Sequence, residues 1–188
     1  MPSRLTPLKP DQLTPEQREA HERVARFRTP GPDGQFGGPF DPWVRSPELS
    51  RRMVSFGNFI WERTSLDRRI VELAICVTAR FWRSNVEWVA HAAAAKRYGV
   101  DDQTLADVMA LRAPASAPAD EQLTVEVCRA IHETHDLPKP LYDRAIAQFG
   151  EQGLVEMMAT IGYYTTVSMT LNAFDVPVAE GISPPFER

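Results

Sequence analysis

The chain has 188 residues, 43% of them apolar, which is enough for the core of one domain. Its 21 Lys and Arg residues are outnumbered by 25 Asp and Glu residues, and the net charge of -4 gives no general attraction to nucleic acid phosphates. No apolar run reaches the roughly 18 residues of a membrane span, and the N-terminus lacks the apolar core of a signal peptide. We therefore expect a single cytoplasmic domain over residues 1–188 that binds neither nucleic acid nor membrane.

The first predicted helix begins at a strong N-terminal signal. Thr14, Pro15 and Gln17 combine an N-cap residue, a proline in the first turn and a capping-box partner, so we expect a helix to about Arg28. Residues 29–45 are too rich in glycine and proline for regular structure, which predicts an extended loop. Its length is typical of a loop that binds a ligand or wraps a subunit contact.

Helix signals continue to the last predicted helix. Caps and prolines at helix starts, together with apolar periodicity, place helices at residues 46–64, 67–81, 85–98, 101–111, 120–135, 138–149 and 151–174. The tail 175–188 is expected to be extended. No alternating run bounded by turns indicates a strand, so the predicted fold class is an all-α bundle of seven or eight helices.

Two polar residues are candidates for proton transfer. Glu72 lies within the apolar run VELAICVTA, where a carboxylate needs a cationic or hydrogen-bonding partner, or a proton of its own. It is either a structural residue that pairs with Arg68 or Arg69, or a general acid or base. His91 follows Glu87 by one helical turn, a spacing that lets a carboxylate orient an imidazole, although a structural pair at a helix surface has the same spacing.

Four residues of the same predicted helix share spacings of three, four and seven. We therefore expect Ser84, Glu87, Trp88 and His91 to line one wall of a site. The two histidines His132 and His135 are three residues apart, but they lie in a charged final turn where histidine also suits the helix dipole, so no metal site is predicted.

The segment RRIVELAICVTARFWRSNVEWVAHAAAAKRYGV resembles the core of the carboxymuconolactone decarboxylase family, which belongs to the AhpD-like superfamily. The segments GGPFDPWVRSPELSRRM and LVEMMATIGYYTTVSMTLNAFDVPV are also similar to this family. Together they cover most of residues 36–178. The resemblance implies an AhpD-like helical bundle that assembles as a homotrimer or homohexamer.

This chain departs from the redox branch of the superfamily. That branch has a glutamate, a Cys-x-x-Cys pair that begins twelve residues later, and a histidine four residues after the pair. Here Glu72 and His91 keep the frame, but Ser84 and Glu87 stand at the cysteine positions. Neither side chain forms a disulfide or a thiolate, so thiol peroxidase chemistry is not expected. The two cysteines, Cys76 and Cys128, lie in apolar helical patterns and are interpreted as core residues.

The resemblance implies a cofactor-independent lyase of aromatic catabolism that decarboxylates a small carboxylated lactone or enol acid. Its catalytic residues would be Glu72, Glu87 and His91, with His91 as the proton carrier. Substrate binding would involve Arg80, as a fork for a carboxylate, and Trp82, Ser84 and Trp88. No metal or organic cofactor is required. The alternatives are an isomerase or hydrolase that acts on a similar small acid, or a non-catalytic protein that binds a ligand or serves in assembly.

Overall fold

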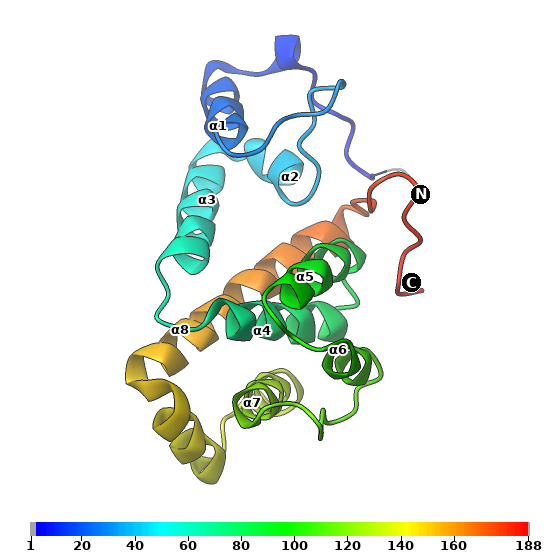
Figure 1. Ribbon diagram of the computed structural model, residues 1–188. Coiled ribbons are helices and arrows are strands. Elements are labelled where there is room, and N and C mark those ends of the chain that lie inside the picture. Colours follow the sequence, from blue (N-terminus) through cyan, green and yellow to red (C-terminus); the bar gives the residue numbers. More distant parts are fainter. Residues whose placement is uncertain (1–2, 188) are drawn as a thin grey trace.

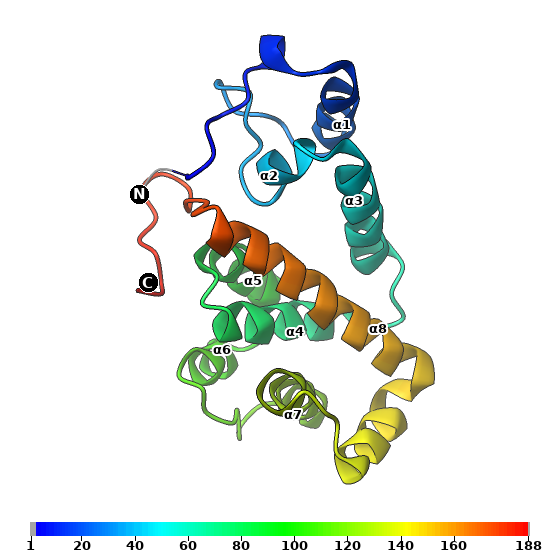
Figure 2. The same ribbon diagram turned by 180° about the vertical axis from the view of Figure 1, so that it is seen from behind.

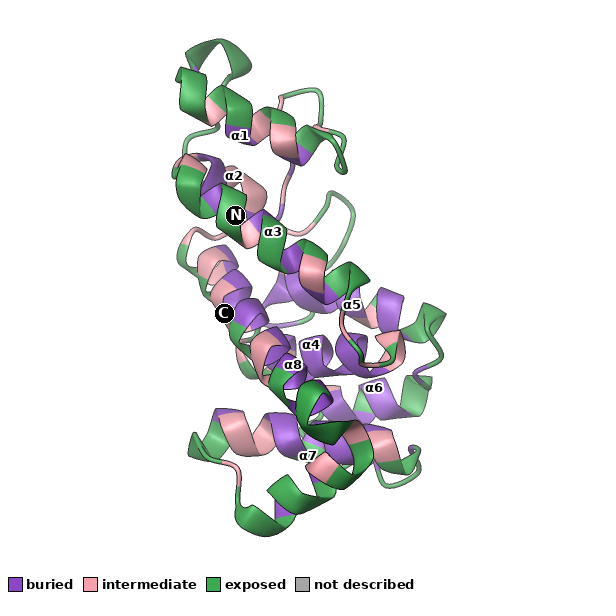
Figure 3. Ribbon diagram, turned by 90° about the vertical axis from the view of Figure 1, so that its left-hand side faces the viewer, coloured by how far each residue is buried: buried purple, intermediate pink, exposed green. Residues whose placement is uncertain are grey.

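Helix α4 (Arg68–Phe81) lies at the centre of the molecule, in a computed structural model that describes residues 3–187 (Figure 1). Residues 70–79 of this helix are all buried. It packs against α5 (Asn85–Arg97), α6 (Asp102–Met109), α7 (Ala119–Thr134) and α8 (Lys139–Ala173). Figure 3 shows the resulting burial, with α4 buried along its length and the outer helices exposed on one face. The apolar run VELAICVTA therefore forms the central core segment.

The N-terminal helices form a separate layer over one end of this bundle. They are a short 3-10 helix (Pro10–Gln12), α1 (Pro15–Ala25), α2 (Phe40–Val44) and α3 (Pro47–Glu62). We call residues 15–62 the N-terminal arm. Figures 1 and 2 show from opposite sides that the arm lies on the opposite side of α4 from α7. The space between the arm and the bundle is where the candidate site lies.

Most helix starts follow the predicted capping chemistry. The Thr14 hydroxyl accepts the backbone N–H of Gln17, and the Gln17 side chain accepts the N–H of Thr14, which completes the capping box. Asp67 and Asp101 cap α4 and α6 in the same way. The N-cap of α5 is Ser84 rather than Asn85, because the Asn85 side chain instead bonds the backbone of Phe186 in the C-terminal tail.

Two larger features differ from the prediction. The loop at residues 29–45 contains the short helix α2, because Trp43 and Val44 are buried there and the Asp41 carboxylate ties the incoming chain at Phe36 and Gly37. The last two predicted helices are one element, α8, with a kink at Gly150. At this residue φ is 70° and ψ is 171°, a conformation that glycine adopts without a Cβ penalty.

The all-α fold class is confirmed, since no residue between 3 and 187 lies in a strand. Over the same residues, none of the helices combines the length and the apolar character that a bilayer span needs.

Candidate active site

A carboxylate of α4 and a histidine of α5 form the centre of the candidate site. Glu72 has no exposed surface, and its Oε2 lies 2.6 Å from Nδ1 of His91. The other ring nitrogen, Nε2, lies 3.3 Å from Oε2 of Glu87, one turn earlier on α5. The imidazole is therefore held between two carboxylates that come from consecutive helices. The structure brings the three predicted catalytic residues together, and their catalytic role remains a prediction.

The second oxygen of Glu72 has its own partner. Arg68 Nη2 donates to Glu72 Oε1 at 2.5 Å, one turn earlier on α4. The Arg68 guanidinium also stacks over the indole of Trp61, 3.6 Å from the ring centroid. Glu72 therefore has both a cation and an imidazole as partners, and its role as a general acid or base remains a prediction.

Tyr164 of α8 covers one face of the imidazole. Its ring is nearly perpendicular to that of His91, with centroids 4.9 Å apart. The Tyr164 hydroxyl accepts the indole N–H of Trp61 at 3.1 Å, so its own proton is available to another acceptor. Burial raises the pKa of Tyr164 well above its ordinary value, and the nearby charge of Glu87 adds to this effect. The phenol is therefore a hydrogen-bond donor at neutral pH.

A cavity of about 580 Å³ opens beside this cluster. Its floor includes Glu87 and His91 of α5 and Tyr164 of α8, and the N-terminal arm contributes Phe40 and Trp61 as the opposite wall. The volume lies within the range of ordinary small-molecule sites. Because Glu72 is fully enclosed behind His91, a ligand in the cavity would meet the imidazole edge and Glu87.

The electrostatics of the cluster favour a protonated histidine. Burial acts to lower the pKa of His91, but the hydrogen bonds to Glu72 and Glu87 and the charges of both carboxylates outweigh it and raise the pKa from 6.5 to about 9. At neutral pH the ring is an imidazolium that donates from both nitrogens. Since Nδ1 faces the enclosed Glu72, the proton on Nε2 is the one nearer the cavity.

Neither cysteine shares this cavity. Cys76 and Cys128 are buried in the core, and both are free thiols. Burial, with a further contribution from the charges of Glu72 and Glu87, raises the pKa of Cys76 well above its ordinary value, and burial raises that of Cys128 to about 12. Both thiols are therefore kept protonated, which agrees with their interpretation as small core residues.

The four predicted substrate-binding residues lie elsewhere. Arg80 donates from Nε to the backbone oxygen of Met109 at 2.6 Å and lines a separate cavity of about 20 Å³. Trp82 follows the end of α4, and its backbone oxygen accepts the side-chain amide of Asn172. Their placement gives these two residues no contact with the main cavity.

Ser84 and Trp88 also lie away from the cavity, although they share helix α5 with His91. Trp88 packs in the core and contacts the ring of Phe186 edge-on, with centroids 5.7 Å apart. Ser84 is fully buried, and its Oγ has no hydrogen-bond partner among residues 3–187. Ser84 is the non-helical N-cap of α5, one turn before Glu87, and Trp88 is turned by about 100° from Glu87. The cavity is therefore lined by Glu87, His91 and Ala94 of this helix instead.

Several contributors to the site could not be placed there by local helix rules. Trp61 and Tyr164 are 103 residues apart in the chain, and only Tyr164 lies in a segment from which the family resemblance is drawn. Arg68 is one of the two partners that the sequence predicts for Glu72, and its spacing of four from Glu72 is the helical ion-pair spacing. Arg97 lines the cavity at the end of α5, three residues after Ala94 on the same stripe.

Comparison with known proteins identifies the central segment. Residues 47–127 match the carboxymuconolactone decarboxylase family. The matched segment is similar to this family and covers less than half of the chain. The resemblance drawn from the sequence is thereby confirmed, and the matched range of the carboxymuconolactone decarboxylase family includes Glu72, Glu87 and His91. No curated protein matches the chain.

Solved structures of AhpD-like proteins share the fold. A peroxidase-related protein with the AhpD core from Ralstonia eutropha JMP134 superposes with a TM-score of 0.76 at 14% identity, over 96% of this chain and 94% of that chain. A peroxidase-related protein from Silicibacter sp. TM1040 gives 0.73 at 14% identity, over 95% and 93%. A debrominase, solved as a cysteine-to-alanine variant in complex with 2,3,4-tribromopyrrole, gives 0.70 at 12% identity, over 96% and 94%. At such identities the likeness shows the AhpD-like fold alone.

Proposed function

We propose that this chain is a cofactor-independent lyase that decarboxylates a small carboxylated lactone or enol acid, with His91 as the proton donor. The observation that carries the proposal is the imidazole held between Glu72 and Glu87 at the edge of a cavity, with Nδ1 2.6 Å from one carboxylate and Nε2 3.3 Å from the other. The match of residues 47–127 to the carboxymuconolactone decarboxylase family supports the same class of reaction.

The reaction needs one proton and a site for one developing negative charge. When the bond to the leaving carboxylate breaks, CO₂ departs and the electron pair moves into a conjugated carbonyl, which gives an enolate. The Tyr164 hydroxyl is a donor for the enolate oxygen, because its own lone pair already accepts the Trp61 N–H. The proton on His91 Nε2 then goes to the carbon that lost CO₂.

The two carboxylates have different tasks in this scheme. Glu72 holds Nδ1–H and fixes the direction of the ring, and Arg68 balances its charge within the protein. Glu87 lines the cavity beside Nε2, where it can pass a proton from water to the neutral imidazole after each turnover. One solvent proton is consumed for each CO₂ released.

A thiol mechanism is poorly supported by this site. The debrominase among the similar structures was solved with a cysteine replaced, whereas both cysteines of this chain are buried, protonated core residues. We therefore expect a variant with Cys76→Ala and Cys128→Ala to keep its turnover if it folds.

The decisive experiment is turnover by His91→Gln on a panel of carboxylated lactones and enol acids, with CO₂ release as the readout. We expect wild-type protein to release CO₂ and the variant to lose roughly 100-fold or more in kcat, which is the usual share of a general acid. Circular dichroism should show the same helical content in both proteins. His132→Gln is the matched control, because it removes a histidine that is equally buried and lies far from the cavity.

Two results would overturn the proposal. One is a His91→Gln protein that decarboxylates as fast as wild type. The other is a wild-type protein that releases no CO₂ from any member of the panel, with His91→Gln changing only stability. The second result would favour a protein that only binds a ligand.

We also propose the predicted homotrimer or homohexamer. The outer face of α8 supports self-association, because Val155 is 68% exposed, Met169 is exposed, and a Cβ added at Gly162 would meet no atom within 4 Å. Light scattering of wild-type protein and of Val155→Lys tests it. We expect a defined oligomer for the first and a smaller species for the second, and a monomeric wild type would contradict the proposal.

A further inference from the structure

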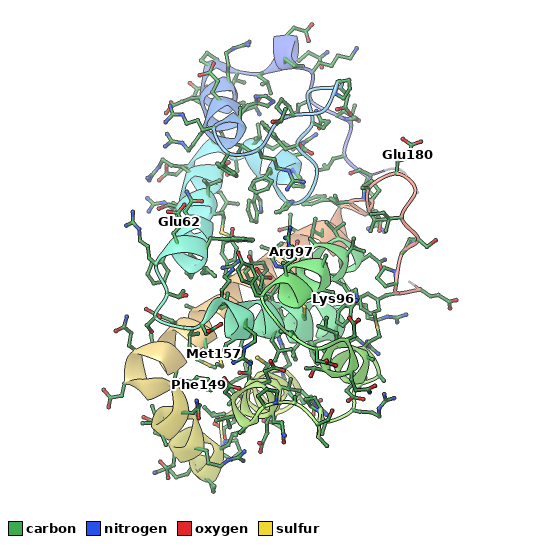
Figure 4. All side chains as sticks on the ribbon, viewed as in Figure 1. Glu62, Lys96, Arg97, Phe149, Met157 and Glu180 are labelled. Atoms are coloured by element: carbon green, nitrogen blue, oxygen red, sulfur yellow. The ribbon has the colours of Figure 1, made fainter. Side chains whose placement is uncertain are left out.

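Arg97 is a cavity-lining cation whose charge the fold leaves uncompensated. It lies in the last turn of α5 (Figure 4), and it lines the same cavity as His91. No carboxylate between residues 3 and 187 lies within ion-pairing distance of its guanidinium. Its neighbour Lys96, which does not line the cavity, pairs with Asp102 at 2.5 Å. Of these two adjacent cations, Arg97 faces the cavity without an ion-pair partner among residues 3–187, whereas Lys96 lies outside the cavity and is already paired.

The balance of charge in the cavity favours an anion. At neutral pH the lining carries the cations Arg28, His91 and Arg97 against the carboxylates Glu62 and Glu87. Glu87 is already paired with His91, and the Nε of Arg28 is used by the backbone oxygen of Phe36 at 2.6 Å. The cavity is thus positive in a chain whose net charge is -4. Arg97 is the cation left to meet a carboxylate, with five donors in a planar fork.

The remaining wall is apolar and faces the same space. Phe40 and Val54 of the arm lie across from Val86 of α5 and Val167 of α8 around the cavity. Arg97 and His91 are six residues apart, which is about 9 Å along the helix axis. That separation and the volume of about 580 Å³ suit a carboxylated lactone or enol acid whose body has one or two fused rings.

We propose that Arg97 binds a carboxylate that stays on the substrate, and that the apolar body of this acid lies against Phe40 and Val167 with its reacting carbon at His91. This substrate class rests on the proposed lyase function. The group that leaves as CO₂ is a different carboxylate, since a cation that held it would stabilise the starting material. The ligand is therefore an aromatic-sized acid that keeps one anionic group throughout the reaction.

Equilibrium binding tests this assignment without any turnover. The probes are 2-naphthoate and its neutral counterpart 2-naphthamide, measured by isothermal titration calorimetry at pH 7.5 and fixed ionic strength. We expect wild-type protein to bind the acid more tightly than the amide. Arg97→Gln should weaken the acid roughly tenfold or more and leave the amide unchanged, as for a lost hydrogen-bonded charge. Lys96→Gln, with the same change in net charge, should leave both affinities unchanged.

A third variant tests whether the electrostatic potential in the cavity favours an anion. Glu62 lines the cavity from α3 and carries the same charge as the ligand, so Glu62→Gln should strengthen binding of 2-naphthoate and not of 2-naphthamide. The assignment is overturned if wild-type protein binds the acid no better than the amide, if Arg97→Gln weakens both probes equally, or if Lys96→Gln matches it. These outcomes are independent of CO₂ release, so the lyase function and the role of Arg97 can fail separately.

Discussion

Two histidines flank α4 and are buried to the same extent, yet their surroundings give them opposite properties. His91 of α5 is 8% exposed and His132 of α7 is 7% exposed. The pKa of His91 is raised to about 9, whereas burial lowers that of His132 to about 4. His91 meets the carboxylate of Glu72, while Nε2 of His132 lies 3.1 Å from the hydroxyl of Thr78, six residues further along α4. The charge of the partner, and not the degree of burial, decides the protonation state.

The two environments also differ in what they offer a ligand. His132 is stacked on Phe81 at an interplanar angle of 14°, beside a cavity of only about 20 Å³. A neutral ring in that position serves as a packing element with one hydrogen bond. His91 is charged and borders the large cavity, so the histidine suited to proton transfer is the one with two carboxylate neighbours.

The largest expected effect comes from Glu72→Gln. This change removes the charge that holds both His91 and Arg68, and it leaves a buried cation without its partner. We expect the free energy of unfolding to fall by about 3 kcal/mol, as for one-sided loss of a buried ion pair. The pKa of His91 should also fall, because burial, which lowers this pKa, is then opposed by the charge of Glu87 and no longer by that of Glu72. Urea denaturation and NMR titration of the imidazole measure the two effects.

Glu48→Gln is the matched control for that variant. Glu48 forms ion pairs with Arg51 and Arg52 on the exposed face of α3, where solvent screens the charges. Its replacement should change stability little and leave the titration of His91 unaltered. Equal destabilisation by both variants would show that the Glu72 pair is no stronger than a surface one.

The pH dependence of stability should separate the two histidines. The raised pKa of His91 means that its contribution is fully present below pH 6.5 and is lost as pH rises through about 9. The lowered pKa of His132 means that its contribution is present above pH 6.5 and is lost as pH falls through about 4. Each slope can reach about 1.4 kcal/mol per pH unit.

Denaturation curves of wild type, His91→Gln and His132→Gln between pH 4 and pH 10 measure these slopes. The difference from wild type should appear on the alkaline side for the first variant and on the acidic side for the second. Differences on the same side for both variants would break the comparison, because they would mean that the two rings share a protonation state.

A smaller loss than that of Glu72→Gln is expected from Thr78→Val. The Thr78 hydroxyl donates to the backbone oxygen of Ala74, so it accepts from Nε2–H of His132. The near-isosteric valine removes this neutral bond, and we expect a loss of about 1 kcal/mol in the free energy of unfolding. The titration of His91 should not move. A loss as large as that of Glu72→Gln would contradict the contrast between a neutral and a charged partner.

Features that depend on neighbours along the chain could be predicted from the sequence. The capping box at Thr14, the buried run of α4 and the spacing of Glu87 and His91 follow from local rules of helices, and each appears in the structure. The family resemblance placed Glu72 in the same frame. Its direct contact with His91 spans 19 residues of the chain, and it could not be predicted without knowing how α5 packs on α4.

Features that depend on how helices pack could not be predicted. Ser84 and Trp88 share a helix with His91, but the position of α8 and the arm decides which stripe of α5 faces the cavity. Arg80 has the chemistry to bind a carboxylate, yet the end of α4 lies beside α6 and directs it to a backbone oxygen. From the sequence, Arg97 is an ordinary basic residue in the last turn of a helix, and only the structure shows that it lines the cavity.

The cavity is bounded by two stretches of chain, residues 27–62 of the arm region and residues 86–167 of the bundle. A ligand that contacts both stretches favours, by mass action, the arrangement in which they lie close together. The connection between α1 and α2 carries arginines at 26 and 28, both exposed, which are sites for trypsin. Slower cleavage there in the presence of a bound acid would report occupancy of the cavity without any assay of chemistry.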